Sequence, residues 1–375
     1  MRIAINTRFL LKGRLEGFGW YTYEICKRLV QNHPEHEFYF FFDRPYDPDF
    51  VFADHVKPIV LGPPARHPVL FYMWYEVAIY RAIKKHRIDL FFSPDGYLSL
   101  RSKIPQIGVI HDINFVHFPK DLPRSASRYL NHFFPKFARK AKHLITVSEY
   151  SKQDIIQSFG VPEKDVSVIW NSASEKFRPL EENNCRDIRT RYTQGQSYFL
   201  FIGSIHPRKN LIRLLQAYTQ YRESVLSEPA FDLVIVGENL WKHKGLTWEA
   251  PASVKKHIHF TGRLEQEELT RVCAAASGLV YVPYFEGFGI PLVEAMKCGI
   301  PIISGNKTAL PEVVDDAGIL VDPYKVEEIT QAMIQLSENE ELRTELAKKS
   351  LERGKLFSWD QAAKEVWEVI SKHLN

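Results

Sequence analysis

Two clusters of residues in the second half of the sequence have the composition of an anion-binding site. The first cluster runs from Gly203 to Asn210, contains the adjacent cations Arg208 and Lys209, and follows the apolar run Phe199–Ile202. A junction between a strand and a helix offers backbone amides and the positive end of the helix dipole to an anion. Two full positive charges beside that junction are enough to hold a diphosphate without a metal ion. The alternative is a helix start with incidental surface cations.

The second cluster, from Glu286 to Glu294, follows the apolar run Leu279–Val282. Gly287 and Gly289 let the backbone approach a ligand closely. The two carboxylates at its ends are good acceptors for vicinal hydroxyl pairs, so they could grip a sugar and a ribose. The alternative is that both carboxylates only favour a helix N-terminus, which explains one of them better than the pair.

Strands and helices alternate along the whole chain, which predicts parallel sheets flanked by helices. At 375 residues the chain is long enough for two domains. A polar stretch from Ser172 to Gln196 reads as the hinge between them, and a capping box at Ser151 and Asp154 predicts a helix start. Two α/β halves predict a ligand cleft between them, at the carboxyl ends of the strands.

Composition sets the broad class. Hydrophobic residues make up 45% of the chain and charged residues 25%, as in ordinary globular proteins, and no uncharged apolar run reaches the roughly 18 residues of a spanning helix. The four cysteines are Cys26, Cys185, Cys273 and Cys298. They lie far apart in the sequence, which predicts a reducing, cytosolic setting.

The net charge of +4 is concentrated between Lys120 and Lys142, where basic residues interleave with aromatic ones. This pattern is compatible with an anionic membrane surface, a phosphorylated acceptor or nucleic acid, and nucleic acid is the weakest of the three because no nucleic-acid motif accompanies it. The alternative is an amphipathic helix with a solvated basic face.

Three other patterns are read as structural. Gly17-Phe18-Gly19 is not a dinucleotide fingerprint, because Thr22 stands where the third glycine belongs. Asp47-Pro48-Asp49 has the spacing of a metal-binding pair but the composition of a turn, so we predict no metal site. Ser148 and Ser151 are expected to cap a helix rather than act as nucleophiles.

Taken together, the motifs resemble the family-4 retaining glycosyltransferases of the GT-B fold, over nearly the whole chain. The segments that carry the resemblance are Glu286-x7-Glu294, Gly203…Arg208-Lys209-Asn210, Leu310-Pro311-Glu312-Val313-Val314, Arg8 with Gly17-Phe18-Gly19-Trp20-Tyr21, His111-Asp112 with Phe115 and Pro119, Val147-Ser148-Glu149-Tyr150-Ser151, and Phe357-Ser358-Trp359. Each is a moderate signal, whereas their order and spacing together are specific. The resemblance implies an α/β fold of two Rossmann-like domains that face each other across a central cleft.

The resemblance also implies roles. Glu286 would bind the transferred hexose and Glu294 the nucleotide ribose, while Lys209 and Arg208 would neutralise the diphosphate. His111 would face the donor sugar across the cleft. The remaining donor-binding positions would be Gly17, Gly19, Gly203, Ser204, Gly287, Phe288, Gly289 and Ile290. Residues 1–175, rejoined by the helix 358–375, would form the acceptor-side domain, and residues 176–357 the nucleotide-sugar domain.

Three departures from the family pattern affect the ligand contacts. Ser204 stands where many relatives carry an arginine, Trp20 replaces a commoner arginine, and Asn171-Ser172-Ala173 lacks the usual Asn-Gly. These departures leave the phosphate grip and the acceptor contacts open.

The resulting prediction is a retaining, metal-independent hexosyltransferase that needs no cofactor beyond its nucleotide-sugar substrate. The likeness is greatest to bacterial mannosyltransferases, which favours GDP-mannose and a glycan or lipid-linked acceptor in cell-surface polysaccharide synthesis. The protein would be cytoplasmic, with peripheral association to the inner face of the membrane. The alternatives are a nucleotide-sugar epimerase or hydrolase of the same fold, and a catalytically silent sugar-nucleotide-binding protein.

Overall fold

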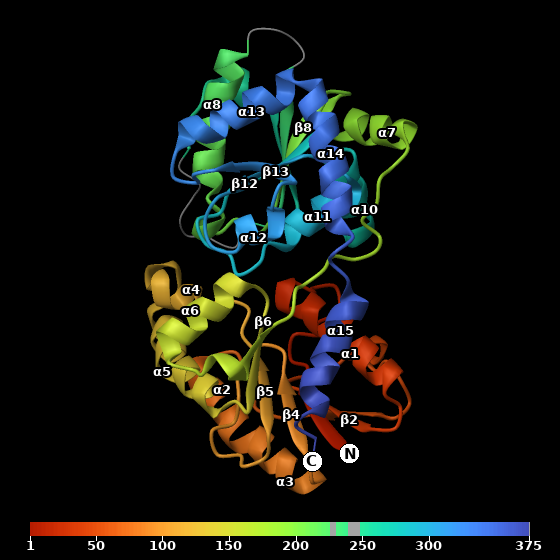
Figure 1. The fold of residues 1–375 in the computed structure, drawn as a ribbon, viewed down its shortest axis with the longest axis vertical. Helices are drawn as coiled ribbons and strands as arrows, with labels where there is room; N and C mark the ends of the chain where they lie inside the picture. The colour runs from red at the N-terminus through yellow and green to blue at the C-terminus, as the bar shows by residue number, and fades with distance from the viewer. Residues whose placement is uncertain (226–229, 239–247, 375) are drawn as a thin grey trace. The chain divides into compact units, whose positions relative to one another are not determined.

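The chain forms two compact units in the computed structural model, which describes residues 1–225, 230–238 and 248–374 (Figure 1). The first unit joins Met1–Asn171 with Ser358–Asn375, and the second is Ser172–Phe357. The division therefore falls at Ser172, where the sequence predicted residue 176, and the C-terminal helix belongs to the first unit.

A seven-stranded parallel sheet forms the centre of the first unit, in the order β3-β2-β1-β4-β5-β6-β7. Its strands are β1 (Arg2–Asn6), β2 (Glu37–Phe42), β3 (Val56–Val60), β4 (Leu90–Ser93), β5 (Gln106–Val109), β6 (His143–Thr146) and β7 (Val166–Val168). The strand order reverses between β1 and β4. In an open α/β sheet, ligands bind outside the carboxyl ends of the strands at such a switch point.

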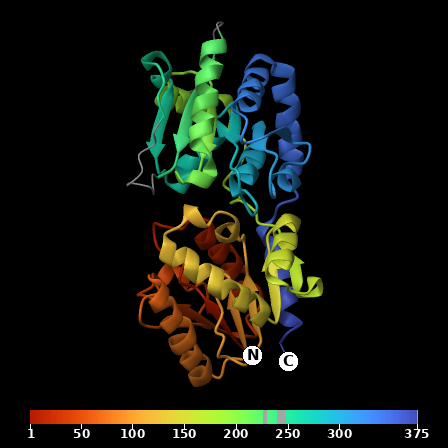
Figure 2. The same cartoon turned by 90° about the vertical axis from the view of Figure 1, so that its left-hand side faces the viewer.

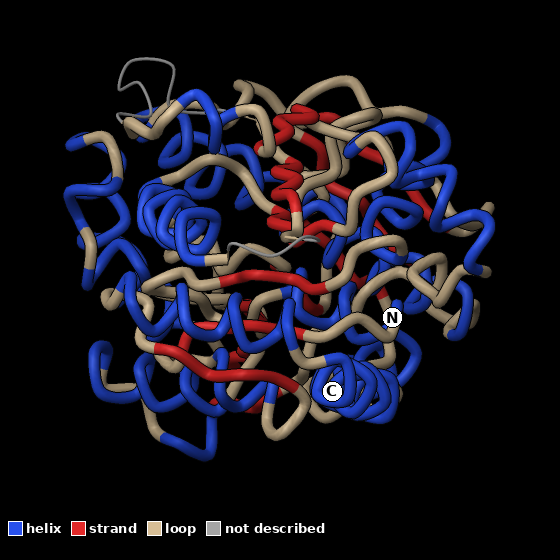
Figure 3. Tube along the Cα trace, turned by 90° about the horizontal axis from the view of Figure 1, so that it is seen from above, coloured by secondary structure: helices blue, strands red, loops and turns tan. Residues whose placement is uncertain are grey.

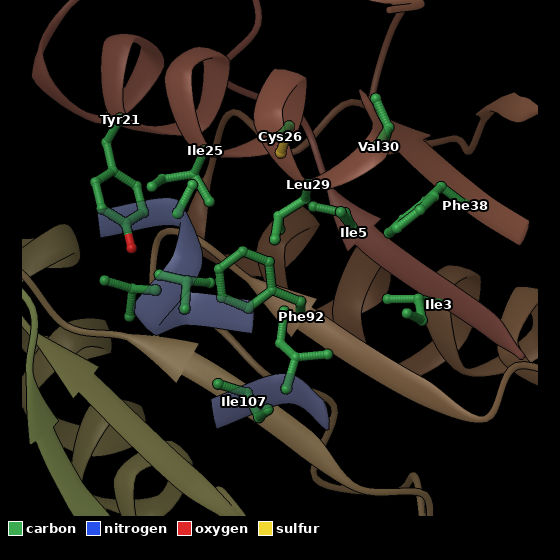
Figure 4. Close-up of a cluster of buried hydrophobic side chains, with 14 of the residues drawn as sticks. Ile3, Ile5, Tyr21, Ile25, Cys26, Leu29, Val30, Phe38, Phe92 and Ile107 are labelled. Atoms are coloured by element: carbon green, nitrogen blue, oxygen red, sulfur yellow. The ribbon is translucent and has the colours of Figure 1, made fainter. Parts of the chain in front are cut away.

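Helices cover both faces of this sheet. They are α1 (Gly17–Asn32), α2 (Pro68–Met73), α3 (Tyr80–His86), α4 (Asn114–His117), α5 (Arg124–Lys140), α6 (Glu149–Phe159) and α15 (Trp359–Ser371), with a π-helical turn, Trp74–Ile79, between α2 and α3. Alternation along β1 supplies both cores, because Ile3 and Ile5 point to one face and Ala4 to the other. The face of Ile3 and Ile5 packs against Ile25 and Leu29 of α1, as Figure 4 shows.

The start of α6 differs from the sequence prediction. The side chain of Ser148 caps the helix by accepting a hydrogen bond from the Ser151 amide at 3.1 Å, so the predicted cap at Ser148 is confirmed and the capping box predicted at Ser151 was three residues late. Ser148 has the extended backbone that a capping residue needs, whereas Ser151 already lies inside the helix.

A six-stranded parallel sheet forms the centre of the second unit, in the order β10-β9-β8-β11-β12-β13. Its strands are β8 (Tyr198–Ile202), β9 (Asp232–Val236), β10 (Ile258–Gly262), β11 (Gly278–Tyr281), β12 (Ile302–Gly305) and β13 (Gly318–Val321). Every residue of β8, β9, β11 and β12 is buried, as expected for strands covered on both faces. The switch point of this sheet lies between β8 and β11.

The helices of the second unit are α7 (Glu182–Thr193), α8 (Leu211–Ser224), α9 (Ala252–Lys255), α10 (Gln266–Ala274), α11 (Ile290–Cys298), α12 (Leu310–Val314), α13 (Val326–Glu338) and α14 (Glu340–Gly354). Helices run along both sides of the strands in Figure 3. The polar stretch 172–196, predicted to contain the hinge, holds the boundary between the units at Ser172, and its second half forms α7, which buries Cys185 and Ile188. Within the described ranges, no helix is both long and apolar enough to cross a bilayer.

Candidate active site

The loops after β8 and β11 bring three of the predicted site residues together in the second unit. Arg208 and Lys209 lie on the 3₁₀ turn Pro207–Lys209 that follows β8, and Glu286 lies in the loop that follows β11. Since β8 and β11 are the neighbours at the switch point, these loops meet at the edge of the sheet where a ligand is expected.

Both cations bind the same carboxylate oxygen. Lys209 Nζ lies 2.6 Å from Glu286 Oε1, and a guanidinium nitrogen of Arg208 hydrogen-bonds that same atom. Arg208 also donates to the Phe285 carbonyl oxygen at 3.3 Å. Lys209 and Glu286 are buried, with 8% and 7% of their surfaces exposed. Burial alone would raise the pKa of Glu286, but the two cations hold it below its usual value. Two cations therefore converge on one buried carboxylate oxygen.

Tyr281, which the sequence reasoning missed, completes this cluster. It is the last residue of β11, its ring is fully buried, and its hydroxyl accepts a hydrogen bond from Lys209 Nζ at 2.6 Å. The same hydroxyl is hydrogen-bonded to the Glu286 carboxylate. Burial raises the pKa of Tyr281 well above its usual range, so the phenol stays neutral. In the sequence, an aromatic residue at the end of an apolar run indicates only a packed core position. The sequence therefore did not predict a role for Tyr281 in the site.

Close backbone packing fixes the start of the first loop. Gly203 continues from β8 with a φ of +152°, and its carbonyl oxygen would lie 1.9 Å from any Cβ added to Gly237. Gly237, which follows β9, is therefore required to be glycine, and the sequence reasoning had not singled it out. Ser204 follows Gly203 in the chain. The amide of the next residue, Ile205, donates a hydrogen bond to the Glu238 carbonyl oxygen at 3.0 Å.

Asn210 fixes the end of the same loop. Its side-chain amide donates to the carbonyl oxygens of Val282 at 2.9 Å and Pro323 at 2.6 Å. Asn210 adopts the left-handed conformation that asparagine tolerates, with φ +60°, and α8 begins at the next residue. The loop of the two cations is thus tied directly to the residue that follows β11.

The glycine-rich loop leads from Glu286 into α11. Gly289 precedes the helix with a φ of +98°, and a Cβ there would lie 3.0 Å from the side chain of Leu292, so this position requires glycine. Gly287 and Phe288 are buried, and Ile290 is the first residue of the helix. The Phe288 ring packs edge-on against Phe357, so only its backbone is placed to meet a ligand.

Glu294 lies one turn into α11, apart from the paired carboxylate. Its Oε2 atom is buried, and no hydrogen-bond partner for it occurs among the residues that the structure describes. Burial raises the pKa of Glu294 to about 7, with only a small opposing effect from Lys209. A buried carboxylate oxygen without a partner is costly unless a ligand supplies the donor.

His111 occupies the corresponding edge of the first sheet, just after β5. Its Nε2 donates to the Pro94 carbonyl at 2.9 Å, which leaves Nδ1 as the acceptor of the neutral ring. The rings of Phe18 and Tyr21 contact it edge-on, with centroids at 4.8 and 4.7 Å. Burial lowers the pKa of His111, so the imidazole is neutral at pH 7.

Gly17 and Gly19 lie in the first turn of α1, whereas the sequence predicted a glycine loop there. The loop after β1 is formed by the residues before them. A Cβ at Gly19 would lie 2.9 Å from the Phe9 carbonyl oxygen, so close packing requires this glycine, whereas a Cβ at Gly17 would meet nothing within 4 Å. Gly17 and Gly19 therefore bracket Phe18, which contacts His111.

A second buried ion pair lies in the first unit, between Arg8 and Asp95. Arg8 Nε donates to Asp95 Oδ2 at 2.6 Å, and the guanidinium stacks near the rings of Phe9 and Tyr97 at 4.5 and 4.6 Å. Asn6 donates to the other oxygen of Asp95 at 2.8 Å. The sequence reasoning missed Asp95, although its position in a Ser-Pro-Asp-Gly turn directly after β4 was a usable signal.

Asp47 and Asp49, which have the spacing of a metal-binding pair, lie in a 3₁₀ turn. Asp47 accepts a hydrogen bond from the Asp49 amide at 3.0 Å. Lys12 pairs with both carboxylates, at 2.8 and 3.2 Å. A cation of the chain itself therefore sits between these two side chains.

Two parallel sheets of Rossmann type, each with a switch point, define the class of GT-B proteins, and comparison with known proteins names the family. Residues 188–353 match the family described as "Glycosyl transferases group 1", and residues 15–174 match "Glycosyltransferase Family 4". O-antigen chain mannosyltransferase B of Escherichia coli is 30% identical over 282 residues, which are 74% of this chain and 73% of that protein.

Solved structures agree on the fold. Sucrose-phosphate synthase from Thermosynechococcus elongatus superposes with a TM-score of 0.79 at 18% identity, covering 99% of this chain and 98% of its own. Anabaena HepE in complex with UDP-glucose gives a TM-score of 0.75 at 17% identity, covering 99% and 100%. The chain belongs to the family-4 glycosyltransferases, and the predicted GT-B fold class is confirmed.

Proposed function

We propose that this glycosyltransferase transfers mannose from GDP-mannose to a glycan or lipid-linked acceptor in the synthesis of a cell-surface polysaccharide. The likeness to an O-antigen mannosyltransferase supports the sugar and the pathway class. The likeness to a protein solved with UDP-glucose supports a nucleotide-sugar donor. The proposed setting is the cytoplasmic side of the inner membrane, and the four buried, unoxidised cysteines fit a reducing compartment.

The observation that carries the proposal is that two cations, Arg208 and Lys209, converge on one oxygen of Glu286 at the switch point. Breaking the bond between the anomeric carbon and its phosphate oxygen places positive charge on the sugar and negative charge on the departing diphosphate. Both cations are placed to stabilise that departing diphosphate. Preorganised cations of this kind stabilise a leaving group without a metal ion, and removing one such donor typically costs about 10²–10³ in rate.

The proposed reaction retains the anomeric configuration. Glu286 is a poor nucleophile, because two cations bind one of its oxygens and hold its pKa low. The acceptor hydroxyl would therefore attack from the face that the diphosphate leaves. Its oxygen forms the new bond to the anomeric carbon, and its proton passes to the departing phosphate oxygen. In this proposal Glu286 holds the hexose, Glu294 the ribose, and His111 the reacting sugar.

A thermal-shift screen across nucleotide sugars tests the donor. A ligand that binds the folded protein raises the melting temperature by mass action, so GDP-mannose at 100 times its Kd would stabilise the protein by about 2.7 kcal/mol. A larger shift with a UDP-sugar than with GDP-mannose would reject the donor. NMR of the product tests the stereochemistry, since an inverted anomeric centre is incompatible with same-face attack.

Two further controls distinguish this transfer reaction from epimerisation, hydrolysis and metal-dependent transfer. Incubation of GDP-mannose without acceptor should leave it intact, whereas an epimerase or hydrolase of the same fold would convert it. Turnover in the presence of a chelator should equal turnover without it if the two cations alone support the leaving group.

A further inference from the structure

Helix α2 is an apolar helix that buries none of its residues. Its sequence is Pro-Val-Leu-Phe-Tyr-Met, and the exposed fractions of Val69, Tyr72 and Met73 are 62%, 48% and 43%. Three large apolar side chains exposed together on one short helix form a patch of the kind that marks an interaction site. A partner is therefore expected to cover this helix.

Helix α5 lies beside α2 and carries positive charge. The Tyr72 ring packs against Phe133 of α5 with centroids 6.1 Å apart, and the two helices lie next to each other on one side of the first unit (Figure 2). Lys136 Nζ lies 5.4 Å from the Phe133 ring centre, and Arg128 is exposed two turns earlier on the same helix. No acidic residue occurs between Arg124 and Lys140 or between Arg66 and Tyr75.

The basic and the aromatic residues of the stretch 120–142 lie in different environments. Its residues Tyr129, Phe134 and Phe137 are buried in the core of the first unit, so they cannot meet a partner. Among its basic residues, Arg128 and Arg139 are exposed, whereas Lys136 and Lys140 are half-buried. The exposed apolar side chains beside α5 come instead from α2, more than 50 residues earlier in the sequence.

We propose that Val69, Tyr72, Met73, Phe133, Arg128 and Lys136, which we call the α2–α5 surface, dock the enzyme on an anionic phospholipid membrane. The inference rests on the proposed membrane-linked acceptor, and it identifies the surface and the lipid chemistry. Apolar side chains enter the headgroup boundary, while the neighbouring cations neutralise lipid phosphates. A stretch of six residues is too short to enter further, so binding is peripheral and sensitive to salt.

Vesicle co-sedimentation tests the α2–α5 surface. The probes are vesicles of phosphatidylglycerol mixed with phosphatidylethanolamine, and vesicles of phosphatidylethanolamine and phosphatidylcholine alone. We expect binding to the anionic vesicles at low salt, weak binding to the neutral ones, and loss of binding at high salt. Reversing the charges (R128E/K136E) should weaken binding more than tenfold, because each basic residue near the surface contributes a factor of about five. Replacing the apolar residues (V69S/Y72S/M73S) should also weaken binding about tenfold or more, because binding strength scales with the buried apolar area.

Matched controls lie on the second unit. Phe260 and Ile212 are as exposed as the α2 residues, so F260S/I212S removes similar apolar surface elsewhere, and K256E/K348E reverses two exposed charges. Both controls should bind vesicles like the unmodified protein. Binding of GDP by calorimetry should be the same in all variants, which shows that they are folded and separates this inference from the donor proposal.

Three outcomes would overturn the inference. The unmodified protein could fail to bind anionic vesicles at low salt, or V69S/Y72S/M73S could bind them normally. Light scattering could instead show a dimer that this variant turns into a monomer, in which case a second copy covers α2. Absence of GDP binding with normal vesicle binding would contradict only the donor proposal.

Discussion

The two units of this protein each contain a buried cluster of charged residues at the switch point of a parallel sheet, yet the clusters differ in how many cations meet the carboxylate. In the first unit, one cation, Arg8, pairs with Asp95. Asp95 also accepts hydrogen bonds from Asn6, Ser93, Tyr75 and the Tyr97 amide. Both oxygens of this carboxylate are therefore bonded within the unit, as expected for a structural ion pair.

In the second unit, one oxygen of Glu286 serves both Arg208 and Lys209. Two cations thus converge at one point, an arrangement that suits an anion with two phosphate groups. The comparison indicates that the convergence of cations, rather than the presence of a buried ion pair, distinguishes a candidate anion site.

The largest expected effect follows from unbalancing the first cluster. Asp95→Ala leaves the Arg8 guanidinium buried without its carboxylate, which should lower the free energy of unfolding by about 3–5 kcal/mol. Denaturant unfolding measures this change. Asp49→Ala is the control, since Asp49 also pairs with a cation but its side chain is 75% exposed, and it should change stability by less than about 1 kcal/mol. Equal effects of the two substitutions would show that the first cluster is not structural.

The second cluster should respond in the opposite way. Lys209→Ala leaves Glu286 paired with Arg208, so the fold is retained, but one cation of the leaving-group site is lost and kcat should fall about 10²–10³-fold. Lys297→Ala is the matched control, because its side chain is 10% exposed against 11% for Lys209 and pairs with Glu175 in the same unit. Near-normal turnover of the Lys209 variant would remove the cluster from the mechanism.

The sequence predicted the second cluster better than the first for a physical reason. Arg208, Lys209 and Glu286 lie in short glycine-containing segments that follow apolar runs, so the charged residues and the end of a strand can be recognised within a few positions of each other. Asp95 and Arg8 are separated by 87 positions, and only the order of the strands brings β1 and β4 together. Strand order is set by packing across the whole sheet, which local patterns do not encode.

Element boundaries and side-chain direction were predicted less well than element type. The chain alternates between strands and helices as expected, but Ser151, where the capping box predicted a helix start, already lies inside α6. Only the structure shows which aromatic residues of α5 are buried. Only the structure shows that the Tyr281 hydroxyl contacts Lys209. The spacing of apolar residues along the sequence identifies a helix. Which segments pack against each face of that helix depends on distant parts of the chain, such as α2 for α5.

Glu294 provides a smaller and pH-dependent test. Burial raises its folded pKa to about 7, above the roughly 4.3 of an unfolded chain. The folded state therefore holds a proton that the unfolded state loses, so stability is greatest below the unfolded pKa and declines as the pH rises towards about 7. Glu294→Gln removes this decline, which amounts to no more than about 4 kcal/mol. The melting temperature of the variant minus that of the unmodified protein should be larger at pH 8 than at pH 5.

Nucleotide affinity tests the same side chain from the other direction. Glu294→Ala should weaken GDP binding by about 1–3 kcal/mol, the range for hydrogen bonds to charged groups, as measured by calorimetry. Glu268→Ala is the control, since Glu268 is also a partly buried helical carboxylate of the second unit but pairs with Arg191. Unchanged affinity of the Glu294 variant would exclude the ribose contact while leaving the pH argument intact.

The smallest effect concerns the hydroxyl that holds Lys209. Tyr281→Phe keeps the buried ring but removes the acceptor at 2.6 Å from Nζ, so the ammonium is positioned by Glu286 alone. The loss of one hydrogen bond of about 1 kcal/mol should lower kcat about fivefold with little change in KM, because positioning matters most as the diphosphate departs. Tyr218→Phe removes an equally buried hydroxyl, which donates to the Phe231 carbonyl at 3.0 Å away from the cluster, and should leave kcat unchanged. If both variants lower kcat equally, or if KM rises instead, Tyr281 supports the fold and does not position the cation.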